Sequence, residues 1–126
     1  MVLDILYSSW YNIIWLYSSN YRNGGNDMLN ITKNLEDKKL TVYLEGRLDT
    51  TTAPQLEESM KENISDVSEL IMDFEKLEYI SSAGLRVLLS CQKIMSKQGS
   101  MKVIHVSDLI KEIFEVTGFI DILTIE

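Results

Sequence analysis

The chemistry that this chain could perform is concentrated in one short segment, Tyr79-Ile80-Ser81-Ser82-Ala83-Gly84-Leu85. Two hydroxyl groups stand there at the predicted start of a helix. Helix N-termini leave backbone N–H groups unpaired and carry partial positive charge. Ser81 is therefore a candidate N-cap. Alternatively, a serine here accepts a phosphate, which the free amides accommodate without unfolding the domain.

A phosphate at this position would add up to about two negative charges and change what the surface binds. Gly84 falls in the first turn of the predicted helix. We interpret it as keeping that turn thin, so that a partner's active site can approach the backbone.

Residue types that often carry catalysis occur elsewhere in unfavourable contexts. His105, the one histidine, lies in an apolar predicted strand, and we interpret it as a structural residue at the strand end or partly buried. Cys91, the one cysteine, lies among aliphatic residues of a predicted helix, where a thiol behaves as a small hydrophobe. The chain has no G-x-S-x-G, P-loop or G-x-G-x-x-G motif. We expect no catalytic residue and no cofactor. We also expect no metal, since one Cys and one His cannot form the usual Cys/His zinc site.

Length and charge narrow the class of protein further. A chain of 126 residues corresponds to one domain. Acidic residues outnumber basic ones 19 to 12, giving a formal net charge of −7, so the chain repels phosphate backbones and direct nucleic-acid binding is not expected. One cysteine excludes a disulfide framework within the chain.

Residues 1–27 differ in composition from the rest: they hold six of the 11 aromatic residues but only three charged ones. No basic start precedes the apolar run, as a secretory signal needs, and the run is too short to span a membrane. Residues 24–28 could be encoded with a GGAGG ribosome-binding sequence just before an ATG for Met28. We therefore expect residues 1–27 to be an N-terminal extension, either disordered or a mis-assigned translated leader, and residues 28–126 to form the domain.

Hydrophobic periodicity predicts the elements that position the serines. Strands are expected at residues 29–35 and 40–46, joined as a hairpin by a polar turn, then at 69–74 and 101–106, with a short strand or tail at 120–125. Helices are expected at residues 53–63, 81–99 and 107–118, and residues 75–80 are predicted to be a loop that displays Tyr79. This order predicts an α/β domain with mostly parallel central strands.

Local signals refine the helices. Thr52-Ala53-Pro54-Gln55 matches a capping box, and Ser107 is expected to cap the last helix. The helix at residues 81–99 carries so many apolar positions that we expect it to be unusually buried. Other apolar residues at helical spacing are expected to face the core: Ala53, Leu56, Met60, Ile64, Leu109, Ile110, Ile113 and Phe114.

In five segments of its sequence, the chain resembles the STAS domain, and specifically the bacterial anti-sigma factor antagonists, or anti-anti-sigma factors. The resemblance covers about residues 29–125. It is carried by five segments in order: Glu45-Gly46-Arg47-Leu48-Asp49, Thr52-Ala53, Leu70-Ile71-Met72-Asp73-Phe74, Tyr79 to Leu85, and Phe114-Glu115-Val116-Thr117-Gly118-Phe119. It implies the STAS fold, a mixed β-sheet of four to five strands with about three to four α-helices packed against it.

The resemblance also implies a site. The phosphorylated residue of this family lies two positions before the helix-start glycine, which is Ser82 here. The family often has Asp just before the phosphoacceptor, whereas this chain has Ser81, so Ser81 is the alternative acceptor. The implied partner-binding residues are Asp49, Thr50, Thr51, Tyr79, Ile80, Ser81, Ser82, Gly84, Leu85 and Arg86.

The function that the resemblance implies is partner switching. The unphosphorylated protein would bind an anti-sigma factor that is also a serine kinase, and so release a sigma factor. The kinase would phosphorylate Ser82 and break the complex, and a PP2C-type phosphatase would restore it. The protein itself would be a cytoplasmic regulator of transcription and not an enzyme, a monomer or weak dimer with no membrane association.

Three alternatives remain open at this point. The chain could be a STAS module of another assembly, such as a signalling scaffold or a lipid-transport complex, because the fold of a domain does not identify its binding partner. It could be a small hydrolase or nucleotide-binding enzyme that uses Ser82, which would need a base. It could be a membrane-tethered STAS domain if residues 1–27 are part of the native protein.

Overall fold

The computed structural model describes residues 29–126, and the predictions for residues 1–27 lie outside this range. The elements, in chain order, are β1 (Leu29–Glu36), β2 (Lys39–Leu48), α2 (Ala53–Lys61), the 3-10 helix η1 (Ile64–Asp66), β3 (Glu69–Ile80), α3 (Ser82–Gln98), β4 (Ser100–Ile104), α4 (Asp108–Thr117) and the 3-10 helix η2 (Phe119–Asp121). The predicted α/β order is confirmed. The segment after η2 contributes a single bridge between Val103 and Ile125 instead of a full strand.

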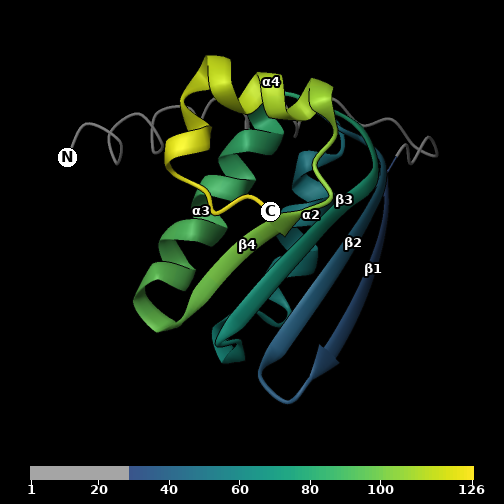
Figure 1. Cartoon of the computed structure of the whole chain (residues 1–126). Helices are drawn as coiled ribbons and strands as arrows, with labels where there is room; N and C mark the ends of the chain where they lie inside the picture. Colours follow the sequence, from purple (N-terminus) through teal and green to yellow (C-terminus); the bar gives the residue numbers. More distant parts are fainter. Residues whose placement is uncertain (1–28) are drawn as a thin grey trace.

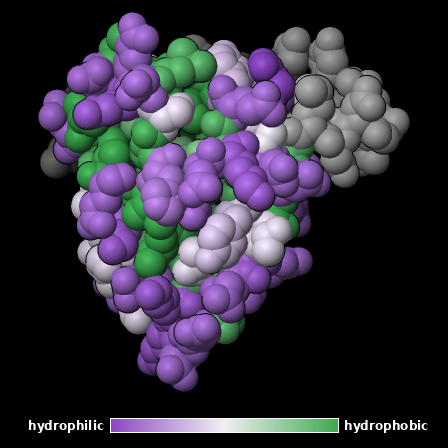
Figure 2. Space-filling model, turned by 45° about the vertical axis from the view of Figure 1, so that its right-hand side comes forward, coloured by the Kyte–Doolittle hydropathy of each residue, from purple (hydrophilic) through white to green (hydrophobic). Residues whose placement is uncertain are grey.

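The four strands form one mixed sheet in the order β1-β2-β3-β4. β1 and β2 form the predicted antiparallel hairpin, while β2–β3 and β3–β4 are parallel pairs. α2 and α3 cover one face of this sheet, and α4 lies across the end at which β4 stops (Figure 1). Figure 2 turns the β1 side of the molecule forward. The surface there is mostly hydrophilic, and hydrophobic residues are visible among the hydrophilic ones.

The core lies between the sheet and the helices. Alternate residues of the strands face α2 and α3, and α3 is as buried as predicted along most of its length. The fully buried side chains include Leu40, Leu44, Leu70, Met72, Phe74, Leu88 and Met95. Each such side chain contributes roughly 1.5–3 kcal/mol on burial. α4 joins this core through Phe114, whose ring lies 6.4 Å from that of Phe74.

The loop predicted at residues 75–80 is wrong, because β3 continues to Ile80. The second half of β2 supplies a pairing edge for these residues: Arg47 is opposite Tyr79 and Leu48 is opposite Ile80, after two shifts in register. The apolar pattern is irregular here because of those shifts, which hid the strand from the sequence. The extension places the start of α3 beside the end of β2.

Two details of the helices also differ from prediction. Thr52-Ala53-Pro54-Gln55 is not a capping box, because Thr52 makes no side-chain cap and Gln55 Nε2 donates to the Leu29 carbonyl instead. In α4, Ser107 Oγ accepts from the Ile110 N–H as predicted, but Leu109 is 51% exposed instead of facing the core. α2 ends at Lys61, close to the predicted end, and the chain continues into η1.

Candidate functional site

The candidate site is the junction at which β3 passes into α3. Ser81 is the N-cap residue, with an extended backbone, and its N–H donates to the Leu48 carbonyl at 2.9 Å. The Leu85 N–H donates to the Ser81 carbonyl at 3.0 Å and begins the helical hydrogen bonding. Ser82 is thus the first residue of a well-anchored helix, and its side chain is exposed.

Ser81 is an N-cap by position only. Its side chain makes no cap hydrogen bond, and its Oγ is buried with no partner among residues 29–126. No acidic residue stands in the first turn of α3. Neither a serine cap nor a carboxylate of the first turn therefore accepts from the first N–H groups of the helix, and their partial positive charge favours an anion at this terminus.

Gly84 faces the interior, which corrects the interpretation that it opens the backbone to a partner. A Cβ at this position would lie 2.6 Å from Leu48 Cγ and 2.8 Å from Ile80 Cγ1. Glycine is required here because α3 packs closely on the ends of β2 and β3. The residue positions Ser82 through packing and offers no surface of its own.

The loop after β2 forms a tight hydrogen-bonded turn beside this junction. Asp49 Oδ1 accepts from the Thr51 N–H at 3.0 Å and from Thr51 Oγ1 at 2.7 Å. Thr52 Oγ1 donates to the Arg47 carbonyl at 2.8 Å and accepts from the Asp49 N–H at 2.8 Å. Partial burial opposes ionisation of Asp49, but the hydrogen bonds from Thr51 and Thr52 outweigh it and lower the pKa of this carboxyl group. Asp49 is therefore a fixed negative charge at neutral pH.

Arg47 is a residue of this surface that sequence reasoning did not include. Its guanidinium lies 4.6 Å from the centroid of the Tyr79 ring, and its Nε lies 3.9 Å from Asp49 Oδ2. The contact follows from the register that places Arg47 opposite Tyr79. The wrong loop prediction hid that pairing, although Arg47 stands in one of the segments that carry the family resemblance.

The predicted site residues divide into two groups. Thr51 and Ser82 are exposed, and Asp49, Thr50, Tyr79 and Arg86 are partly exposed. Ile80, Gly84 and Leu85 are buried and shape the junction from below. Arg86 is four residues after Ser82 and so lies on the same side of α3.

The two residues set aside as non-catalytic lie elsewhere. His105 Nδ1 faces Asp73 at 3.1 Å, and roughly 20 Å of strand separates that part of β3 from the start of α3. His105 therefore offers no base to Ser82. Cys91 is buried, and burial raises the pKa of its thiol to about 12, as expected for an inert core residue.

Comparisons with known proteins identify the family of this chain. The sequence profile of the STAS domain matches residues 29–126. The chain belongs to the STAS domain family. The anti-sigma-B factor antagonist of Staphylococcus aureus is 31% identical over 97 residues, which cover 75% of this chain and 90% of the relative.

Solved structures share the STAS fold. A crystal structure of an anti-sigma factor antagonist from Mycobacterium paratuberculosis has a TM-score of 0.71 at 21% identity, covering 77% of this chain and 84% of the other. The Bacillus protein SpoIIAA in its phosphorylated form has a TM-score of 0.62 at 18% identity, covering 77% and 91%. The mixed sheet and helices of this STAS domain thus match the predicted fold. No helix within residues 29–126 is long and apolar enough to cross a membrane.

Proposed function

We propose that this STAS domain is an anti-sigma factor antagonist that is switched off by phosphorylation of Ser82. In this proposal the unmodified protein binds, in the cytoplasm, an anti-sigma factor that is also a serine kinase, and the sigma factor is released. A PP2C-type phosphatase removes the phosphate and restores binding. The protein is the ligand and substrate in these steps and not an enzyme.

The observation that carries the proposal is the position of Ser82. It is the exposed first residue of α3, beside the rigid Asp49 turn and the Arg47–Tyr79 pair. Its neighbour Ser81 has a buried Oγ, which a kinase could reach only after the helix start opened. This difference in exposure favours Ser82 over Ser81 as the acceptor.

A phosphate on Ser82 would be tolerated by the fold. It would lie at the N-terminus of a 17-residue helix, where negative charge is stabilised by the free N–H groups. Arg86, one turn later, supplies a positive charge on the same side of the helix. The modification adds charge outside the core, so the packing of Gly84 against Leu48 and Ile80 is unchanged.

The same phosphate would be unfavourable in a complex. Asp49 is already a fixed negative charge beside the junction, and up to about two more would be added. A charge buried at an interface without a counterion is costly, on the order of 2–5 kcal/mol. The relative SpoIIAA is known in phosphorylated and unphosphorylated forms, which supports a modification that leaves the fold intact.

The test is incubation of the full chain with its cognate anti-sigma factor kinase and ATP, followed by mass spectrometry of the phosphopeptide. We expect one phosphate on Ser82, no phosphate on Ser82→Ala, and normal phosphorylation of the matched control Ser81→Ala. Ser82→Ala should bind the kinase constitutively, and Ser82→Asp should bind it weakly. Phosphate on Ser81 alone, or tight binding by Ser82→Asp, would contradict the proposal.

A further inference from the structure

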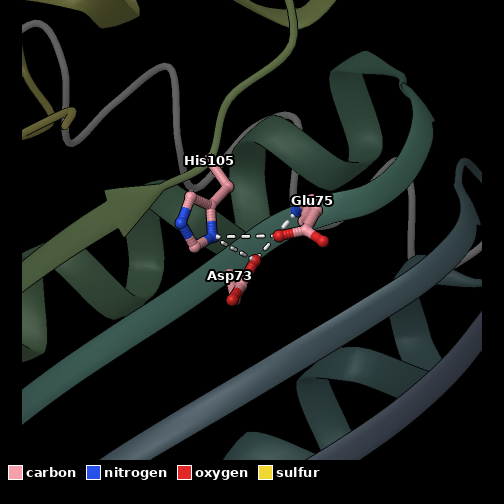
Figure 3. A group of neighbouring side chains, drawn as sticks. All are labelled: Asp73, Glu75 and His105. Atoms are coloured by element: carbon pink, nitrogen blue, oxygen red, sulfur yellow. Dashed lines mark hydrogen bonds and ion pairs between the residues drawn. The ribbon is translucent and has the colours of Figure 1, made fainter.

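A second group of polar side chains lies where β4 ends beside the middle of β3. Asp73 is opposite Ile104 in the register of these strands, and His105 follows Ile104 directly. Glu75 is two residues after Asp73 and points to the same side of β3. Figure 3 shows the three side chains converging on the face of the sheet away from α2 and α3.

The donor atoms of this group are close enough to share one ion. His105 Nδ1 lies 3.1 Å from Asp73 Oδ1 and 3.6 Å from Glu75 Oε1, and all three ligand atoms lie within 4.8 Å of one another. Two ligands of a tetrahedral metal ion with bonds of roughly 2.1 Å are about 3.4 Å apart. The Glu75 N–H donates to Asp73 Oδ1 at 2.9 Å and holds that carboxylate in place, as outer hydrogen bonds do for metal ligands.

A simple ion pair does not account for the arrangement. A hydrogen on His105 Nδ1 is within hydrogen-bond reach of Asp73 Oδ1, at 3.1 Å, whereas Glu75 Oε1 at 3.6 Å is too far to accept it. Within residues 29–126, His105 is the basic residue whose side chain lies within 4 Å of the Asp73 and Glu75 carboxylates. Two carboxylates converging on one nitrogen, in a chain of net charge −7, form a local excess of negative charge.

We propose that Asp73, Glu75 and His105 form a binding site for a divalent transition-metal ion, with Zn²⁺ as the preferred one. An imidazole nitrogen with carboxylate oxygens suits Zn²⁺, and Mn²⁺ less strongly, whereas Mg²⁺ and Ca²⁺ prefer oxygen ligands alone. Three protein ligands leave the remaining positions to water. The side chains of His105 and Glu75 are 54% and 67% exposed, so the ion can enter from solvent.

This site goes beyond the proposed function and is independent of Ser82. From the sequence we expect no metal, because the chain cannot form the usual Cys/His zinc site. The site proposed here differs from that kind, since two of its three ligands are carboxylates. Cys91 would not compete for the ion, since its thiol is buried and burial raises the pKa to about 12.

The test is titration of the full chain, without any histidine tag, with ZnCl₂, MnCl₂ and MgCl₂ in a calorimeter. We expect one Zn²⁺ per chain, weaker binding of Mn²⁺ and no detectable binding of Mg²⁺. His105→Asn and Glu75→Gln should each weaken Zn²⁺ binding by at least about tenfold. Glu58→Gln, the same charge change on an exposed position of α2, is the matched control and should bind as the wild type does.

Asparagine is chosen at position 105 because His105 has a φ of 57°, a left-handed conformation that asparagine tolerates. Circular dichroism would confirm that the variant is folded, and Asp73→Asn provides a second variant if it is not. Since the chain has one histidine, ¹⁵N NMR of the imidazole reports the ligand atom directly. A Zn²⁺-dependent shift of Nδ1 is expected. No Zn²⁺ binding, equal binding by His105→Asn, or a shift that does not involve Nδ1 would overturn the proposal.

Discussion

The start of α3 and the end of β4 are polar regions of opposite electrostatic character. At the start of α3, a helix N-terminus without a side-chain cap lies beside the exposed Ser82, with Arg47 and Arg86 nearby. At the end of β4, two carboxylates converge on one imidazole nitrogen. The first region suits an added negative charge, and the second suits a bound cation. A helix terminus offers partial positive charge to an anionic group even in a chain whose net charge is −7.

Phe74 belongs to the core beneath the sheet, and its replacement should have the largest effect on stability. It is fully buried between Asp73 and Glu75 and contacts Phe114. Phe74→Ala should lower the free energy of unfolding by about 3–5 kcal/mol, because it leaves a cavity in the core. Urea denaturation followed by circular dichroism measures this loss. A loss below 1 kcal/mol would contradict the close packing of Phe74 against Phe114 in the core.

Gly84 should separate the two regions. Gly84→Ala should cost about 1–3 kcal/mol, because the added Cβ overlaps Leu48 and Ile80 and forces α3 away from the sheet. Partner binding at Ser82 should weaken, while the imidazole of His105 should keep its NMR chemical shifts. Gly118→Ala, at a position with open space and a φ of 84°, measures the cost of left-handed backbone strain without steric overlap and serves as a contrast. Equal effects on both regions would contradict their independence.

Asp49 should give the stability of the domain a specific pH dependence. Because the folded-state pKa of Asp49 is lowered, its stabilising contribution is present above the ordinary pKa near 3.8 and is lost as the pH falls through the folded value. Asp49→Asn should therefore be less stable than the wild type at pH 7, by about 1 kcal/mol. The difference should shrink toward pH 3 in denaturation measurements. A stability difference between the two proteins that grows as the pH falls would contradict a lowered pKa of Asp49.

The Arg47–Tyr79 contact should have the smallest effect. The cation–π interaction at a partly exposed site contributes about 0.5–1 kcal/mol. A double-mutant cycle with Arg47→Ala and Tyr79→Leu measures the coupling between the two side chains. We expect a coupling within that range and no effect on Zn²⁺ binding. A coupling of zero would mean that the register of β2 and β3 brings the residues together without an energetic gain.

The sequence was sufficient for features that depend on contiguous residues. The hairpin, the buried α3 and the position of the two serines at the start of that helix follow from local patterns, and all are observed. Features that depend on pairing between distant segments were not predictable. Residues 75–80 become a strand only because β2 offers them an edge, Gly84 faces inward only because Leu48 lies against it, and Asp73 meets His105 across two strands with no fixed spacing in the sequence.

In the proposed switch, a phosphate on Ser82 changes binding and not folding. The most direct measurement is the dissociation constant of the cognate anti-sigma factor for the unmodified chain and for the chain phosphorylated at Ser82, by titration calorimetry. We predict affinity at least about thirtyfold weaker for the phosphorylated chain, with identical far-UV circular dichroism. Equal affinities of the two forms, or weaker binding accompanied by loss of the folded spectrum, would contradict the account.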